Sequence, residues 1–132
     1  MQYYLFLLGR LLFGGYFMMA GLNHFMHLKM MAGYAASKKV PMPKAAVIVS
    51  GLLIFLGGLW VLTGVYVPVG VAELALFLVV VTFKMHDFWN DKDPMAKMGN
   101  MVNFQKNTAL LGAALMLLQI GDWGWVLSDL WK

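Results

Sequence analysis

Four apolar runs, each close to twenty residues long, dominate the sequence. They cover about residues 3–26, 45–64, 67–85 and 101–120. A helix needs about 20 consecutive apolar residues to span the hydrocarbon core of a bilayer. The composition agrees, because 61% of the 132 residues are hydrophobic and only 12% are charged. A chain of this size cannot bury that much apolar surface within itself, so the excess must face lipid.

We therefore predict an all-α integral membrane protein with a single domain, residues 1–132, formed by a bundle of four transmembrane helices. The first run starts without a basic leader segment, so we expect it to remain as a span. Residues 29–43 predict a short interfacial helix between the first two spans. The tail after Gly121 is too short and too polar to span, and its three Trp predict an interfacial position. Pro94 and Gly99, with the charges between them, should prevent a continuous helix between the last two runs.

The distribution of lysines predicts the orientation. Eight of the ten Lys and Arg residues lie in or beside the first and third connections, which fall on one side of the bilayer. The positive-inside rule places that side in the cytoplasm and both termini outside it. Anionic lipid headgroups explain the net charge of +4 better than nucleic acid does, since the lysines lie between apolar runs.

Two charged residues lie inside the predicted spans. Arg10 and Glu73 each lie roughly 10 Å below the non-cytoplasmic boundary, at 1.5 Å per residue. A lone charge at that depth costs about 2.5–3.5 kcal/mol on insertion scales, so each needs a partner. We predict an Arg10–Glu73 ion pair, which either clasps two helices or handles a ligand or protons. By helical phase, His24 should then approach Lys84 or Asp87 at the other end.

A second polar group is expected at the cytoplasmic end of the spans. His86 joins it only if the third span ends before that residue. These side chains could hydrogen-bond a quinone headgroup, with Trp stacking, or simply anchor the protein at the interface. The predicted ligand-binding candidates are His24, His86, Asp87, Trp89, Asn103, Lys106 and Asn107.

Metal and thiol chemistry find no support in the sequence. The histidines lack a diagnostic ligand spacing, so we predict no metal site. The chain has no cysteine, which excludes dithiol relays and cysteine-ligated clusters within it. We predict no cofactor with certainty, and a quinone is the candidate for the polar group.

Several motifs, in order along the chain, resemble those of the DoxX family of small four-helix bacterial membrane proteins. They are GRLLFGGYFMMAGLNHF (9–25), GYAASKKVPMP (33–43), LGGLWVLTG (56–64), HDFW (86–89) and NFQKNTALLG (103–112). Many relatives carry an acidic residue near the position of Ser50, which this chain lacks. The resemblance implies a multi-pass protein of the bacterial inner (plasma) membrane. The matching residues carried over by it are Arg10, His86, Phe88, Trp89, Asn103, Lys106 and Asn107.

The resemblance implies a membrane subunit of a redox system that binds quinone and docks a soluble oxidoreductase partner. The family takes its name from similarity to the membrane subunit of a thiosulfate:quinone oxidoreductase. One alternative is a non-enzymatic membrane anchor or scaffold. Another is a small-solute transporter, although four short helices without an internal repeat leave little room for alternating access unless a homo-oligomer forms. A quinone or lipid tail between the helices would favour the redox subunit, and a filled seam with an exposed Met-rich face would favour the anchor. A polar channel through Arg10 and Glu73 would favour the transporter.

Overall fold

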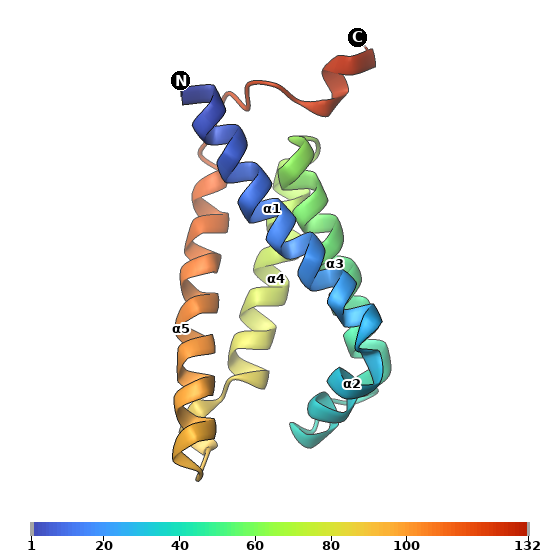
Figure 1. Cartoon of the computed structure of the whole chain (residues 1–132), viewed down its shortest axis with the longest axis vertical. Coiled ribbons are helices and arrows are strands. Elements are labelled where there is room, and N and C mark those ends of the chain that lie inside the picture. Colours follow the sequence, from blue (N-terminus) through green and yellow to red (C-terminus); the bar gives the residue numbers. More distant parts are fainter. Residues whose placement is uncertain (1, 132) are drawn as a thin grey trace.

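The computed structural model describes residues 2–131, and every regular element in that range is helical. Four long helices run along the molecule (Figure 1): α1 (Gln2–Met26), α3 (Pro43–Thr63), α4 (Val67–Met85) and α5 (Pro94–Leu117). The shorter elements are α2 (Leu28–Ser37), the 3-10 turn η1 (Phe88–Asn90) and the 3-10 turn η2 (Leu127–Trp131). The prediction of an all-α protein with a short helix after the first span is confirmed.

Three of the helices described, α1, α3 and the segment beginning with α4, are long and apolar enough to cross a membrane. Only 22–33% of the residues in their most apolar windows are buried within the protein. The remaining apolar side chains point outward, as lipid contact requires. The helix α5 is 24 residues long, but five Lys and Asn residues lie along it: Lys97, Asn100, Asn103, Lys106 and Asn107. A membrane protein is therefore confirmed, and a fourth crossing by α5 stays a prediction.

The fourth long helix begins earlier than predicted. We expected a span starting near residue 101, whereas α5 starts at Pro94 and includes Gly99. The side chain of Asp93 accepts a hydrogen bond from the backbone N–H of Ala96 at 2.8 Å, and Pro94 occupies the first turn. This cap and the preset φ of proline start the helix before the apolar run begins. Gly99 is tolerated because it is one weak position within a well-capped helix.

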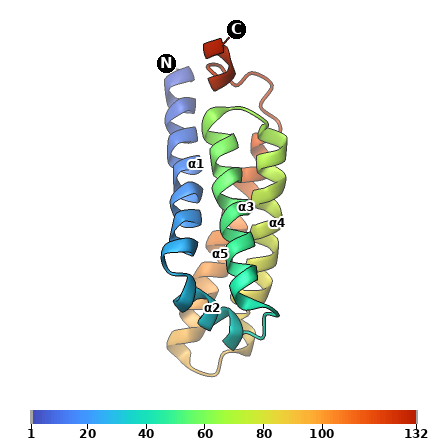
Figure 2. The same cartoon turned by 90° about the vertical axis from the view of Figure 1, so that its right-hand side faces the viewer.

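Glycines set how closely α1 approaches α3. A Cβ atom added to Gly14 would lie 2.6 Å from the carbonyl oxygen of Gly58, and one added to Gly21 would lie 2.7 Å from that of Gly51. The two backbones are therefore in contact at two levels, two turns apart on each helix. Small residues allow such contact where no hydrophobic force acts between helices in lipid. Helix α4 packs on the other side of α3, and α5 packs on α4 (Figure 2).

The core lies along the middle of the bundle. Its largest fully buried side chains belong to α1, α3 and α4: Phe17, Ile54, Val61, Val71, Leu74 and Leu78. Ala114 of α5 is also fully buried against this core. The first, second and third spans are thus held together by direct packing, while α5 joins mainly through α4.

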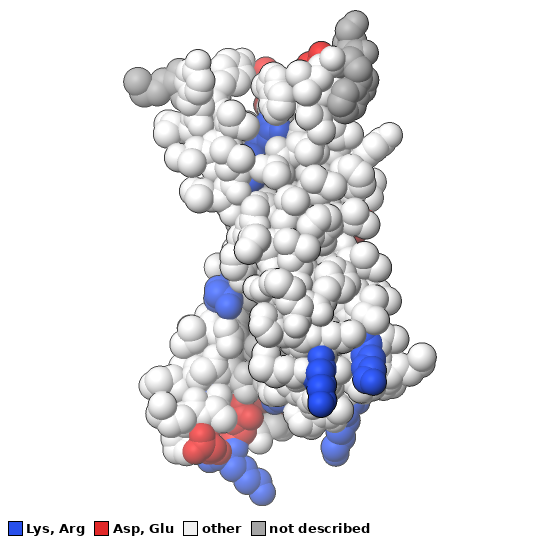
Figure 3. Space-filling model, turned by 45° about the vertical axis from the view of Figure 1, so that its right-hand side comes forward, with Lys and Arg blue, Asp and Glu red and all other residues white. Residues whose placement is uncertain are grey.

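The two ends of the bundle differ in chemistry. The start of α1 and the tail with η2 lie at one end, and α2 and the α4–α5 connection lie at the other (Figure 1). Blue lysine side chains gather at the α2 end on the face shown in Figure 3. This asymmetry agrees with the predicted side of the lysines. The asymmetry alone does not show which end faces the cytoplasm, so the predicted orientation stays a prediction.

Candidate functional site

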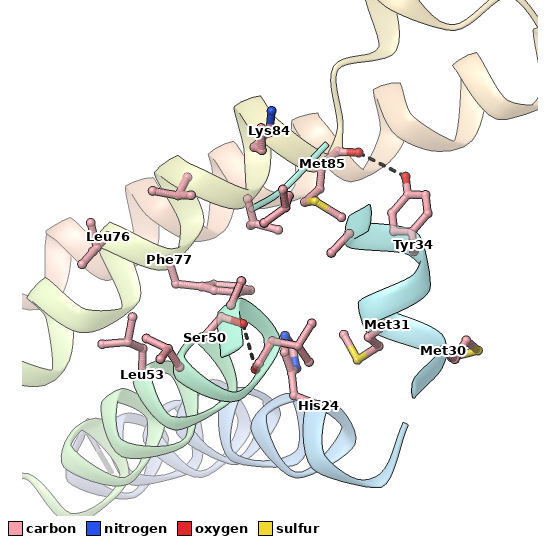
Figure 4. A pocket seen from close by; sticks show the side chains of 17 residues that line it. His24, Met30, Met31, Tyr34, Ser50, Leu53, Leu76, Phe77, Lys84 and Met85 are labelled. Carbon is pink, nitrogen blue, oxygen red and sulfur yellow. Dashed lines mark hydrogen bonds between the residues drawn. The ribbon is translucent and has the colours of Figure 1, made fainter. Parts of the chain in front are cut away.

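A half-open cavity lies at the α2 end of the bundle, and we call it the α2 pocket. Its volume is about 680 Å³, and almost all of its lining atoms are apolar. The end of α1, the helix α2, the first half of α3 and the second half of α4 form its walls (Figure 4). Residues that define it include His24, Met31, Tyr34, Ser50, Phe77 and Lys84.

The α2 pocket exists because the chain turns away from α3 after α1 ends. The α1 and α3 backbones are in contact at Gly21 and Gly51. One turn later α1 ends, and α2 folds back over the start of α3. The small residues Ala32 and Ala35 pack against Val47 and hold α2 there. The space between α2 and α4 is left lined by flexible and branched apolar side chains.

Four polar side chains lie in the wall of the α2 pocket. The Nδ1 atom of His24 lies 2.8 Å from the carbonyl oxygen of Ala20, and its ring meets Phe77 edge to face at 5.9 Å. The hydroxyl of Ser50 donates to the Val47 carbonyl at 3.1 Å. Lys84 is exposed at the rim. The fourth is Tyr34, considered next.

A network of polar side chains lies beside the α2 pocket, where α2 meets the end of α4 and the start of α5, and we call it the polar clasp. It consists of Tyr34, Lys38, His86, Asp87, Asp91 and Asn100. The Tyr34 hydroxyl donates to the Met85 carbonyl at 3.1 Å and lies 3.4 Å from Oδ1 of Asn100. That same Oδ1 atom lies 3.1 Å from Nδ1 of His86, and the Asn100 amide donates to Asp91 at 2.8 Å. The clasp thereby joins α2 to the end of α4 and to α5.

An ion pair completes the polar clasp. The Lys38 ammonium lies 2.5 Å from Oδ1 of Asp87 and 3.8 Å from Oδ1 of Asp91. The hydrogen bond to Asp87 holds the pKa of the Lys38 ammonium above its ordinary value, against the opposing effect of burial. The other Asp87 oxygen accepts from the Asn90 amide at 2.9 Å. Lys38 is therefore charged at neutral pH and ties the end of α2 to the loop before α5.

The predicted polar group divides into three parts in the structure. His24 lines the α2 pocket, while His86 and Asp87 belong to the clasp. The third span was expected to end before His86 if that residue was to join the group, and α4 does end at Met85. His24 was expected to approach Lys84 or Asp87. Both His24 and Lys84 line the α2 pocket, whereas Asp87 pairs with Lys38. The predicted group is therefore not one site.

The remaining predicted candidates lie on or beside α5, away from the α2 pocket. Trp89 is half-exposed and packs edge to face with Phe104 at 5.9 Å. The Lys106 ammonium donates to Asn103 at 2.9 Å, and both side chains lie outside the pocket lining. Asn107 is buried.

The predicted Arg10–Glu73 ion pair is wrong. The buried guanidinium of Arg10 donates instead to four backbone carbonyls, those of Val61 (3.3 Å), Leu62 (2.8 Å), Trp123 (3.0 Å) and Trp125 (2.6 Å). Two of them belong to the last turn of α3, where helix carbonyls lack intrahelical partners and carry partial negative charge.

The other partner of the predicted pair is left without a hydrogen bond. The Oε2 atom of Glu73 is buried and has no hydrogen-bond partner among the described residues.

Gly64 leaves the space that Arg10 needs to reach these carbonyls, since a Cβ at Gly64 would lie 2.8 Å from the Arg10 guanidinium. The energetic cost of a lone charge in the membrane correctly predicted that Arg10 has hydrogen-bond acceptors, but it did not predict which ones.

Sequence reasoning missed most of the clasp. Lys38 carried no distinctive signal, because its partner Asp87 lies 49 residues later in the chain, and Asn100 belonged to none of the motifs. The concentration of Met near this end was a usable signal: Met30, Met31 and Met85 line the α2 pocket. Among the described residues no group of three His, Cys, Asp or Glu side chains is placed to hold a metal ion.

Comparison with known families identifies the chain. No match was found among curated proteins or solved structures. The model of the DoxX family matches residues 5–87, which is more than half of the chain and extends from α1 to the clasp residue Asp87. The α2 pocket lies wholly within the matched range, whereas the motif NFQKNTALLG (103–112) of α5 lies outside it. The chain therefore belongs to the DoxX family of membrane proteins.

Proposed function

We propose that this chain is a membrane subunit of a redox system that holds a quinone in the α2 pocket and works with a soluble oxidoreductase. The observation that carries the proposal is the pocket itself. Its volume of about 680 Å³ falls within the range of small-molecule sites, about 300–1,000 Å³. Such sites are mainly apolar with a few polar groups, and that description fits the α2 pocket.

The lining suits a lipid-soluble ring with a prenyl tail. The branched walls of α3 and α4 offer apolar contact along the tail, and flexible Met30 and Met31 can adapt to its shape. Phe77 offers an aromatic surface for the ring, and His24 offers a polar atom beside it. When bound, a quinone supplies the capacity to carry two electrons and two protons; this chain supplies binding and orientation.

Two features of the chain support a soluble partner protein. The chain has no cysteine, so a thiol or iron–sulfur relay would have to come from another protein. The polar clasp lies at the lysine-rich end, beside the exposed Trp89, Met95 and Met98. Exposed aromatic and Met side chains at a water-facing end suit protein contact. The anchor or scaffold alternative would use this surface alone and leave the α2 pocket without a ligand.

The test is direct binding to the purified full-length chain in mild detergent. We expect quinone to be co-extracted, as detected by mass spectrometry, and added decylubiquinone to raise the thermal stability. Val80→Trp should place a large ring in the pocket wall and weaken the stabilisation. Val79→Trp is the matched control, because Val79 is the adjacent exposed valine of α4 and lies outside the lining.

Two results would count against this proposal. If no quinone is retained and decylubiquinone leaves the stability unchanged, the anchor function gains support. If a Lys106→Met variant abolishes the stabilisation while Val80→Trp does not, the site lies on α5 and not in the α2 pocket.

A further inference from the structure

The polar atoms that the α2 pocket presents to a ligand are hydrogen-bond acceptors. A backbone carbonyl can only accept, so the short contact between Nδ1 of His24 and the Ala20 carbonyl requires the proton on Nδ1. In the neutral ring, Nε2 then carries a lone pair and accepts. No hydrogen bond within the described chain occupies Nε2, and the residue lines the pocket (Figure 4).

The two hydroxyls of the pocket wall, those of Ser50 and Tyr34, are also acceptors toward a ligand. Ser50 uses its hydrogen on the Val47 carbonyl, and Figure 4 shows this bond at the pocket wall. Tyr34 uses its hydrogen on the Met85 carbonyl. Each oxygen keeps lone pairs that can accept a further hydrogen bond. Neither hydroxyl has a second hydrogen to donate to a ligand.

Donors are scarce in the α2 pocket. Most of the lining residues are helical, and their backbone N–H groups are used within the helices. Val40 lies outside the helices, but its N–H donates to the Ala35 carbonyl at 3.0 Å. The one cationic donor in the lining, Lys84, is exposed, and its ammonium points away from the cavity in Figure 4. The pocket therefore matches a ligand that donates hydrogen bonds.

We infer that the α2 pocket prefers the reduced, dihydroxy form of its ligand, with Nε2 of His24 accepting a hydrogen bond from one ring hydroxyl. This inference rests on the proposed function, because it concerns the redox form of a quinone bound there. A quinone carries only carbonyl acceptors, so it would face the acceptors of His24 and Ser50 without a hydrogen between them. A hydroquinone supplies that hydrogen, and His24 is the group placed to receive it.

The test compares three ligands on the purified full-length protein under anaerobic conditions: decylubiquinone, decylubiquinol and the dimethyl ether of that quinol. Binding is measured by ligand-induced thermal stabilisation over a concentration series. One neutral hydrogen bond contributes enough for the quinol to bind about three- to ten-fold more tightly than the quinone. The ether has the same ring and tail but no donor, so it should bind no better than the quinone.

Variants assign the acceptor. His24→Phe keeps an aromatic ring without Nε2 and should reduce the quinol preference to about one, with quinone affinity retained. His27→Phe is the matched control, since His27 has the same contact with a carbonyl four residues earlier, at 3.3 Å, but is exposed and lies outside the pocket. The ligand comparison uses the unmodified protein, so it decides the question even if His24→Phe does not fold.

The outcomes separate the two proposals. Equal binding of quinol and quinone, tighter binding of quinone, or an ether that binds as well as the quinol would overturn the acceptor preference and leave the quinone site standing. A preference that survives intact in His24→Phe would overturn the role of His24. Failure of all three ligands to bind would overturn the proposed function and this inference together.

Discussion

Replacing Arg10 by Gln is the sharpest test of how α1, the end of α3 and the C-terminal tail are held together. The substitution removes the positive charge and most of the donors that reach the carbonyls of Val61, Leu62, Trp123 and Trp125. Hydrogen bonds to charged groups contribute about 1.5–3 kcal/mol each. The four are not additive, because they share one guanidinium and the freed tail carbonyls can meet water.

We expect Arg10→Gln to lower the free energy of unfolding by about 3–4 kcal/mol. Arg10→Lys should cost about 1–2 kcal/mol, because an ammonium keeps the charge but has only three donors for four carbonyls. Unfolding would be followed in mild-detergent micelles titrated with sodium dodecyl sulfate. Near-ultraviolet circular dichroism would report the packing of Trp123, whose ring meets Phe6 of α1 at 5.2 Å.

The same experiment decides between the observed contacts and an ion pair. Glu73→Gln should not lower the free energy of unfolding, since Arg10 does not contact that carboxyl and its buried Oε2 atom has no hydrogen-bond partner to lose among the described residues. In the double-mutant cycle, the coupling between Arg10→Gln and Glu73→Gln should stay below about 0.5 kcal/mol. A coupling above about 1 kcal/mol, or a loss below about 1 kcal/mol for Arg10→Gln alone, would refute the reasoning.

Three further perturbations address the helix contacts and the clasp. Gly21→Ala places a Cβ 2.7 Å from an α3 carbonyl oxygen and should destabilise the protein by about 1–3 kcal/mol in the same unfolding assay, whereas Gly15→Ala, with open space around its Cβ, should be neutral or stabilising. Tyr34→Phe removes one hydrogen bond of about 1 kcal/mol and should speed hydrogen exchange of the α2 amides without changing exchange in α3. Asp87→Asn should also speed α2 exchange, by weakening the ion pair with Lys38. Because the folded-state pKa of Lys38 is raised, its contribution is fully present at neutral pH and is lost only as the pH rises through that raised value. Relative to the intrinsic exchange rate, α2 protection should therefore be constant near neutrality and fall only in strong alkali.

The sequence was sufficient for the overall fold because the hydropathy that decides it is a local property of the chain. The apolar runs are read directly along the chain, and the boundaries of α1, α3 and α4 follow from their lengths and from residues such as Pro43 and Gly64. The start of α5 was misplaced because hydropathy reports lipid contact and not helix capping. The bond from Asp93 to the Ala96 amide extends that helix into a polar segment.

The contacts of Arg10 were harder to predict. The free-energy cost of burying a charge shows that the charge needs acceptors, but it does not show which acceptors. Side-chain charge is visible in a sequence, whereas the free carbonyls at a helix end are not. A signal was nevertheless present. Gly64 marks the end of α3 on the same side of the membrane as Arg10, so carbonyl acceptors at that depth could have been expected.

The α2 pocket depends on long-range placement in the same way. Residues 29–43 predicted a short helix in the interface; α2 confirms the helix, and its interfacial position stays a prediction. Its packing through Ala32 and Ala35 onto α3, and its bonds to a loop some fifty residues later, follow from tertiary structure alone. His24 was identified by its helical phase, which places it on the same stripe of the first span as Arg10; Ser50 and Tyr34 gave no comparable signal.

The α2 pocket and the polar clasp share a wall, and Tyr34 is the residue in both. Its ring lines the pocket, and its hydroxyl bonds the end of α4 and approaches Asn100 of α5. A ligand that contacts Tyr34 and Met31 binds only while α2 lies against α3, so by mass action it must stabilise that position and the clasp with it. A partner protein that draws Asn100 or Asp87 toward itself acts on the same equilibrium from the aqueous side. Binding of the proposed ligand and of the proposed partner would therefore be coupled through the docking of one short helix. The coupling is measurable as ligand-dependent protection of α2 amides that Tyr34→Phe diminishes.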